Sequence, residues 1–567
     1  MKLILTVACI LMKPACKTVS LCSALTALLL APLAALAESP PAASPLLDVF
    51  PESKAPTFYE KPSEFVVSRQ FRPGATRSQW AEGVDERAVF HAYLTHKSTS
   101  ERSWELRLGK GGQIYSVVSS FGEAMPPQSA LAPFVDEVWQ MVAINTDLLD
   151  RMPELGKSKI REESNSYIHQ SGMYVDKKDQ PLSPKKPFYA PLLATLEDAA
   201  ARSYAVMNWG QVPTASIHRS DVLFTTQYRD LGAGVIEMSY LCFNFGNFPL
   251  NGLNTPWGGV RTSVFPELVL SQPDGSYRFH TPFSIDMPGT HGDIAKTGGW
   301  AAATQNAANP AAYSLGLVFG RDLHWPEQQQ LQRAKTPGFQ KSPTVYGAGD
   351  SRHGVRDYTV MDVSSRVMIQ PGECFFRRVF LVLGTLSEVA DAGRKLESFA
   401  DYQMMDFTEA DTPLLPLYVK PMDKDQFVPT PDAPTPDAKP IARLYARPVK
   451  HSKPLFLLQE AATGRYRLTT DPALLNRKEP FANPYPAGDP KHAAFQNRVQ
   501  YVNYEGPAKS MTLLGYVMPR EKADATKHRY ATLSTIPALA DFFQAGESLS
   551  ADALIIRTSD KPESAPH

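Results

Sequence analysis

The chain has 567 residues and carries 58 acidic and 58 basic side chains, so its formal net charge is zero. No long basic run is interleaved with aromatic residues, and binding to nucleic acid therefore has no electrostatic support. The length exceeds that of one ordinary hydrophobic core and predicts two or more domains. The 49 prolines favour strands joined by irregular loops over long helical bundles.

The first residues have the form of an export signal. Lys13 and Lys17 precede the apolar stretch 19–37, which ends in the small-residue cleavage pattern Ala-Leu-Ala. We expect a signal peptide over 1–37, a periplasmic or extracellular product, and no membrane span after cleavage. The alternative is an uncleaved membrane anchor, which Pro32 and the short apolar length disfavour.

Three of the five cysteines lie in this leader, which leaves Cys242 and Cys374 in the mature chain. Both stand in strand-like runs. In an oxidising compartment they form a disulfide, or they stay as two buried thiols, because the sequence fixes no distance between them.

Residues 38–60 are rich in Pro and Ala and predict a flexible tail, after which a large domain is expected over 61–419. Its strand-like runs form hairpins at 103–123, 222–246 and 264–280, each with a turn that contains glycine. The remaining runs are less regular. Residues 134–145 fit a helix or a strand, and 194–211 start helix-like and end as a strand. Residues 387–404 form the best helix, with Ser387 as its N-cap.

Residues 420–440 are dominated by Pro and Asp and predict a linker. Strand-like runs over 441–558 then predict a small β-rich domain, followed by a disordered tail over 559–567. The expected fold is mainly β: a large antiparallel β-sandwich with a small C-terminal β-rich module.

Three motifs are similar to those of the galactose mutarotase-like supersandwich proteins, a fold shared with many polysaccharide lyases. They are the Gly-Gly hairpin of GGQIYSVVSSFGE, the central strand VIEMSYLCFNFGNFPL, and the turn and strand of IQPGECFFRRVFLVLG. The resemblance covers about residues 60–410 and implies a carbohydrate-related role. The family's catalytic residues have no residue-by-residue match in this chain, and a fold alone does not give a function.

The stretch 208–266 gathers aromatic, polar and basic side chains at its turns, as a sugar-binding cleft requires. The residues that we expect to bind sugar are Trp209, Gln211, Asn254, Trp257 and Trp300. The alternative for each tryptophan is a place in the core of a large sandwich, which is the more frequent outcome for a single tryptophan.

Cleavage of a uronate chain by β-elimination needs a base, an acid and a cation that neutralises the carboxylate. We expect His169 or His218 as the base, Tyr228 as the acid and Arg261 as the cation. Arg261 follows two glycines that leave room for a ligand, but a structural ion pair with Glu267 would explain it equally well.

Motifs for nucleotides, for lipases and for zinc proteases do not occur, and no cofactor or metal is expected. The favoured hypothesis is a secreted polysaccharide-degrading enzyme, a lyase before a hydrolase. A non-catalytic glycan-binding or envelope protein and a mutarotase-like epimerase are the alternatives. The sequence does not indicate the oligomeric state.

Overall fold

A computed structural model places just over half of the chain, and all of that part belongs to the unit Ala43–His567. The structure describes residues 45–69, 90–98, 103–109, 112–119, 122–125, 140–144, 165–167, 192–210, 221–247, 250, 252–260, 264–280, 290–321, 344–349, 359–365, 369–422, 427–460, 463–471, 476–480, 483, 485–490, 492–497, 499–503, 508–523, 530–542 and 554–556. The expected signal peptide and C-terminal tail lie outside these residues.

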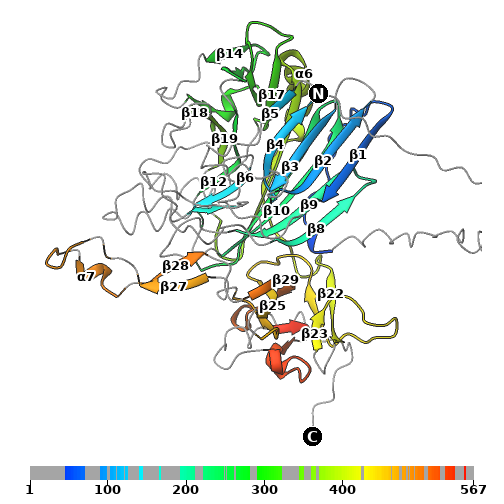
Figure 1. Cartoon of the computed structure of the whole chain (residues 1–567), viewed down its shortest axis with the longest axis vertical. Helices are drawn as coiled ribbons and strands as arrows, with labels where there is room; N and C mark the ends of the chain where they lie inside the picture. The colour runs from blue at the N-terminus through cyan, green and yellow to red at the C-terminus, as the bar shows by residue number, and fades with distance from the viewer. Residues whose placement is uncertain are drawn as a thin grey trace, which may run out of the picture. The chain divides into compact units, whose positions relative to one another are not determined.

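Antiparallel sheets dominate the described part of the chain, which confirms the predicted mainly-β sandwich (Figure 1). The central sheet has ten strands, and their order is β14 (Tyr277–His280), β13 (Glu267–Ser271), β16 (Trp300–Thr304), β17 (Tyr313–Val318), β20 (Cys374–Thr385), β11 (Val235–Asn244), β10 (Val222–Gly232), β9 (Ser203–Trp209) and β8 (Leu192–Asp198), with β21 (Asp401–Met405) also paired to β20.

Two smaller sheets are formed by strands that lie within residues 63–365. The first sheet contains β1 (Ser63–Arg69), β2 (Phe90–Ser98), β3 (Trp104–Gly109), β4 (Ile114–Ser119) and β5 (Gly122–Met125) in that order. The six-stranded sheet contains β15 (Thr290–Asp293), β18 (Thr344–Gly349), β19 (Thr359–Ser365), β12 (Gly252–Val260), β6 (Gln140–Ile144) and β7 (Asn165–Tyr167).

The C-terminal sheet contains β23 (Phe427–Thr430), β22 (Leu414–Pro421), β24 (Ala442–Tyr445), β29 (Ala508–Val517), β25 (Lys453–Glu460) and β26 (Tyr466–Thr469), and β31 (Leu554–Ile556) joins β24 to β30 (Tyr530–Thr532). A separate ribbon pairs β27 (Asn476–Pro480) with β28 (Val499–Asn503). The helical elements are short: α6 (Leu386–Leu396), α7 (His492–Phe495), and the 3-10 turns η1 (Pro45–Leu47), η3 (Ile294–Lys296), η5 (Glu397–Phe399), η7 (Arg520–Lys522), η8 (Leu533–Thr535) and η9 (Ala540–Phe542).

The central sheet is covered on both faces. Every residue of β9 and β11 is buried, whereas an antiparallel sheet with one wet face would show alternation. We call the face that packs on the first sheet the inner face; Leu94 and Leu106 meet Met238 there. The opposite, outer face packs on the C-terminal sheet, where Phe243 contacts Tyr516.

Helix α6 covers another part of the outer face. It begins at a capping box, in which Thr385 accepts from the Glu388 backbone N–H and the Glu388 carboxylate accepts from the Thr385 N–H. Its apolar side packs on β16 and β17, and the helix ends at Leu396. The helix is therefore shorter than the predicted 387–404 and has Thr385, not Ser387, as its cap, because residues from Asp401 onward pair with β20.

Residues 45–62, which we call the N-terminal strap, are ordered along the outer face instead of forming the expected flexible tail. Leu46, Leu47 and Val49 are buried in the same cluster as the C-terminal sheet. Further along, the Phe58 N–H donates to the Leu231 carbonyl at 2.6 Å. Apolar side chains and backbone hydrogen bonds therefore hold this segment despite its Pro- and Ala-rich composition.

The expected linker at 420–440 lies inside the C-terminal sheet. Strand β22 begins at Leu414 and pairs with β24, and β23 lies within the Pro- and Asp-rich stretch. The C-terminal sheet therefore starts before residue 420. Its buried residues share one cluster with the outer face of the central sheet.

The three predicted hairpins are confirmed by the pairing of β3 with β4, β10 with β11, and β13 with β14. Gly232, Ala233 and Gly234 all have positive φ, as the tight β10–β11 turn requires. Within the segment 194–211, the described residues 194–210 belong to strand β8, a turn and strand β9, so the helix-like start was misleading. Residues Gln140–Ile144 are a strand.

Candidate functional site

The predicted site residues are only partly visible in this structure. His169, Gln211, His218 and Arg261 lie outside the described residues. Asn254 and Trp257 lie in β12, at an irregularity where its pairing with β6 and β19 shifts register. Their backbone is placed, and the roles given to these residues remain predictions.

The three remaining residues lie in the core and not in a shared cleft. Trp209 packs on the outer face under the C-terminal sheet, and Trp300 packs on the outer face against α6. Tyr228 lies on the inner face. All three are almost completely buried, so Trp209 and Trp300 are core residues and form no sugar platform with each other.

The Tyr228 hydroxyl has a structural partner: it donates to the Gly112 carbonyl at 2.7 Å. Gly112 has φ +78°, and a Cβ there would lie 2.4 Å from Val206 Cγ1, so only glycine fits this turn. Burial raises the pKa of Tyr228 well above its usual value. The phenol therefore fixes the β3–β4 turn against the central sheet.

A second polar group on the inner face has the residue types of a binding site. Tyr240, Arg377 and Tyr402 occupy one cross-strand row on β11, β20 and β21, where Tyr240 pairs with Arg377 and Arg377 pairs with Tyr402. The Arg377 guanidinium carbon lies 5.4 Å from the centre of the Tyr402 ring. We call these three residues the inner-face row.

Arg377 is fully buried, which is rare for arginine. Burial lowers its pKa to about 10, and the neighbouring Tyr402 and Tyr240 oppose that shift. Burial also raises the pKa of Tyr240, whose hydroxyl donates to the Met238 sulfur at 3.4 Å. The row thus combines a cation with a protonated phenol. The Arg-Arg pair within the apolar run CFFRRVFLVLG is the sequence signal that could have identified it.

The outer face carries a different polar cluster, which we call the outer hub. Glu237 accepts from Arg229 Nη2 at 3.0 Å and lies 3.5 Å from Arg378 Nε. The strap completes it, because Ser53 Oγ donates to the Glu237 carboxylate and Arg378 donates to the Pro51 carbonyl. Burial lowers the pKa of Arg378, and Glu237 opposes that effect. The negative charge of Glu237 and the positive charges of Arg229 and Arg378 are thus balanced within the protein, with added hydrogen bonds from the strap.

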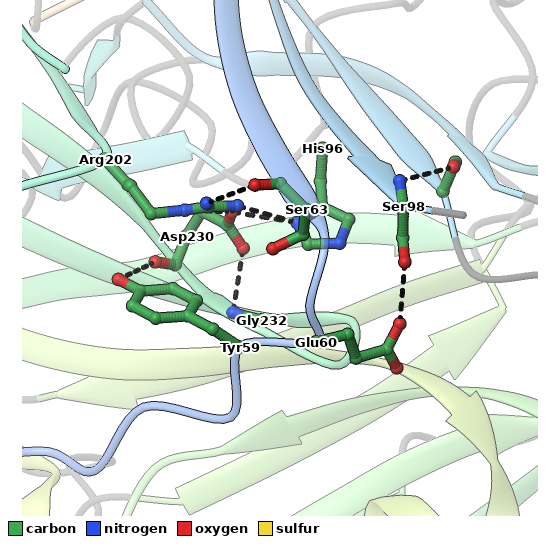
Figure 2. A network of polar contacts seen from close by, with 9 residues as sticks. Tyr59, Glu60, Ser63, His96, Ser98, Arg202, Asp230 and Gly232 are labelled. Atoms are coloured by element: carbon green, nitrogen blue, oxygen red, sulfur yellow. Dashed lines mark hydrogen bonds and ion pairs between the residues drawn. The ribbon is translucent and has the colours of Figure 1, made fainter. Parts of the chain in front are cut away.

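A third polar network joins the first sheet to the central sheet (Figure 2). Asp230 on β10 accepts from Arg202 Nε at 2.9 Å, lies 2.9 Å from His96 Nδ1 and accepts from the Gly232 N–H at 2.9 Å. The Tyr59 hydroxyl donates to the Asp230 carbonyl at 3.1 Å, and its ring stacks under the Arg202 guanidinium at 4.5 Å. The network links the strap, β2, the β8–β9 turn and β10.

Within the described part of the chain, no three His, Cys, Asp or Glu side chains are grouped so that they could hold a metal ion. Likewise, none of the helices in that part is long and apolar enough to cross a membrane. Cys242 and Cys374 are free and buried. They lie on neighbouring strands but on opposite faces of the central sheet, in two different core clusters. They therefore form no disulfide with each other.

No family model matches the chain, and no curated protein matches it. Among solved structures, it is similar to a putative aldose 1-epimerase from Klebsiella pneumoniae subsp. pneumoniae MGH 78578, at 12% identity and a TM-score of 0.31, over 54% of this chain and 83% of that one. A putative aldose 1-epimerase from Escherichia coli K12 aligns at 10% identity and a TM-score of 0.27, over 52% and 99% of the two chains. A heparan sulfate lyase from Pedobacter heparinus aligns at 4% identity and a TM-score of 0.24, over 52% and 35%.

The lack of any matching family model agrees with the expected lack of a close family match. Such low identities and TM-scores carry no functional assignment. The function of the chain has to be argued from its own residues.

Proposed function

We propose that the chain is a carbohydrate-active protein that recognises an acidic polysaccharide, and that it cleaves this substrate as a lyase rather than as a hydrolase. The observation that carries the proposal is the inner-face row, in which a buried guanidinium lies between two tyrosines in adjacent register positions. Arginine binds carboxylates through two parallel hydrogen bonds, and tyrosine offers both a ring face and a hydroxyl to a sugar.

The same residue types suit β-elimination from a uronate. A guanidinium on the carboxylate stabilises the negative charge that develops when the adjacent C–H proton is removed. Burial raises the pKa of Tyr240, so its hydroxyl is protonated and can donate to the leaving glycosidic oxygen. We therefore assign the cation to Arg377 and the acid to Tyr240.

The sequence predicts Tyr228 as the acid and Arg261 as the cation, whereas we give these two roles to Tyr240 and Arg377. Tyr228 holds the β3–β4 turn through Gly112, so Tyr240 is the better acid on the same face. Arg261 becomes a second cation, and His169 or His218 stays the proposed base. Because Arg377 and Tyr240 are fully buried, a substrate reaches them only if the residues that cover the row move.

The test follows the ultraviolet absorbance of an unsaturated uronate product while the mature protein meets a panel of acidic polysaccharides. A parallel assay counts new reducing ends. Arg377→Met is the diagnostic variant, and Arg278→Met, at an exposed position on β14, is the matched control. We expect the absorbance to rise with the wild type and the control and to be lost with Arg377→Met.

The other results are equally informative. Reducing ends without the absorbance would contradict the lyase and indicate hydrolysis. Retention on a polysaccharide column without cleavage would indicate a binding protein. Activity that survives in Arg377→Met would overturn the assignment of the inner-face row.

A further inference from the structure

The His96 ring, which belongs to the network in Figure 2, stacks on a second aromatic ring. His96 on β2 and Trp104 on β3 are cross-strand partners, with ring centres 5.7 Å apart and planes 15° from parallel. His96 has no exposed surface, and Trp104 is 3% exposed. Both side chains point into the core between the first sheet and the inner face.

Each ring carries a buried nitrogen that lacks a protein partner. Among the described residues, neither His96 Nε2 nor Trp104 Nε1 forms a hydrogen bond. Burying a polar atom without a partner costs about 1–3 kcal/mol, so native structures rarely leave such an atom on each of two stacked rings. The indole nitrogen is always a donor, whereas the role of His96 Nε2 depends on the tautomer.

The Asp230 contact determines that tautomer. Nδ1 lies 2.9 Å from Asp230 Oδ2 and 3.1 Å from Arg202 Nη2. Nδ1–H can donate to the carboxylate, and a bare Nδ1 can accept only from the guanidinium. Arg202 donates to Asp230 through Nε and through one hydrogen of Nη2, and the second Nη2 hydrogen is the competing partner for Nδ1. The shorter contact, to an ionised acceptor, is also the stronger one. We assign the hydrogen to Nδ1, which makes Nε2 an acceptor.

The pair therefore presents one donor, Trp104 Nε1–H, and one acceptor, His96 Nε2, on neighbouring rings. A ligand that bridges them must accept from the indole and donate to the imidazole, which is what a hydroxyl group does. The burial of both rings restricts that ligand to the smallest neutral hydroxylic molecule. We infer that a single water molecule is bound between His96 and Trp104.

This site is separate from the inner-face row and does not depend on the proposed function. The bound water extends the hydrogen-bond chain in one direction, from the indole through water and imidazole to Asp230. Buried waters of this kind satisfy polar groups that the protein leaves without partners. The site completes the polar connection between the first sheet and the central sheet.

The direct test is a high-resolution crystal structure of the mature protein together with ¹H–¹⁵N spectra of its indole groups. We expect an ordered water oxygen within hydrogen-bond distance of both nitrogens, and magnetisation transfer from long-lived water to one indole N–H. Trp104→Phe should remove that signal, and Trp300→Phe, at another buried tryptophan, should leave it. Histidine ¹⁵N shifts should report the Nδ1–H tautomer for His96.

An absent water peak, or a protein group in its place, would overturn the inference. A hydrogen on Nε2 instead of Nδ1 would overturn the inferred direction of the hydrogen-bond chain, because the water would then accept from both rings and donate to neither. Neither of these results requires a variant, so the inference stays testable if Trp104→Phe does not fold.

Discussion

Two adjacent arginines on β20 show how differently the central sheet uses its two faces. Arg378 points to the outer face, where Glu237 and the strap carbonyl of Pro51 bind it. Arg377 points to the inner face, where it lies over the Tyr402 ring beside Tyr240. The same residue type in the same strand thus belongs to an ion-pair hub on one side and to an aromatic row on the other.

The comparison sets a charge that the protein's own groups compensate against a charge that we propose to be functional. A buried ion pair with excellent geometry holds its partners in place, and removing one partner leaves a costly buried charge. A guanidinium over one tyrosine ring and beside a second tyrosine has the composition of a recognition site. We therefore expect changes in the outer hub to reduce stability and changes in the inner-face row to reduce ligand binding.

The largest effect should come from Glu237→Gln in the outer hub. The change removes the carboxylate between Arg229 and Arg378, and breaking such a buried pair costs about 3–5 kcal/mol. Urea unfolding measures the loss. Asp391→Asn, in the exposed pair with Arg394, is the control and should change the unfolding free energy by less than about 1 kcal/mol. Equal effects at the two sites would contradict a special role for the hub.

On the inner side, Asp230→Asn should have a smaller effect. It weakens the charged hydrogen bonds to Arg202 and His96 by about 1.5–3 kcal/mol in total, because Arg202 is partly exposed and can turn to water. Thermal unfolding should show the loss, and hydrogen exchange should show that β1 and β2 lose protection first. Unchanged protection in those strands would exclude the network as their attachment to the central sheet.

The strap offers a milder perturbation of the outer hub. Ser53→Ala removes a hydroxyl that donates to Glu237 while leaving both arginines, and should cost about 1 kcal/mol. Ser276→Ala, in an exposed turn, is the matched control. Limited proteolysis should cut the Ser53→Ala strap faster than the wild-type strap. Resistance equal to the wild type would show that apolar contacts alone hold this segment.

The smallest effect is expected when alkylating reagents meet the two cysteines of the folded protein, one on each face of the central sheet. Burial raises the pKa of both Cys242 and Cys374, so neither thiol forms a thiolate at about pH 8 in the folded protein. Alkylating reagents should modify them only after unfolding. Rapid modification of Cys374 alone would mean that the C-terminal sheet opens away from the outer face.

The sequence predicted the fold class and the hairpins because these depend on local signals. Alternating apolar runs and glycine turns gave the β3–β4, β10–β11 and β13–β14 pairs. It failed where tertiary contacts override composition. The strap is Pro- and Ala-rich, yet Leu46 and Leu47 are buried against a sheet whose strands lie hundreds of residues away. The helix-like start of 194–211 became β8 because β9 pairs with it.

The candidate site was harder to predict for the same reason. Side chains within 208–266 were grouped by proximity in sequence, but alternate residues of a strand point to opposite faces. Trp209 and Tyr228 consequently point to different faces. The inner-face row combines β11, β20 and β21, and only the pairing register brings Tyr240, Arg377 and Tyr402 together. No feature of the sequence gives that register.

The most direct test of the functional assignment is the affinity for an acidic oligosaccharide, measured by calorimetry with a neutral oligosaccharide of equal length as the comparison ligand. We predict that the wild type binds the acidic chain in preference to the neutral one. Arg377→Met should bind the acidic chain at least about tenfold more weakly, a loss of about 1.4 kcal/mol, with unchanged unfolding. Equal affinity of wild type and Arg377→Met for the acidic chain would contradict the inner-face row as the carbohydrate site.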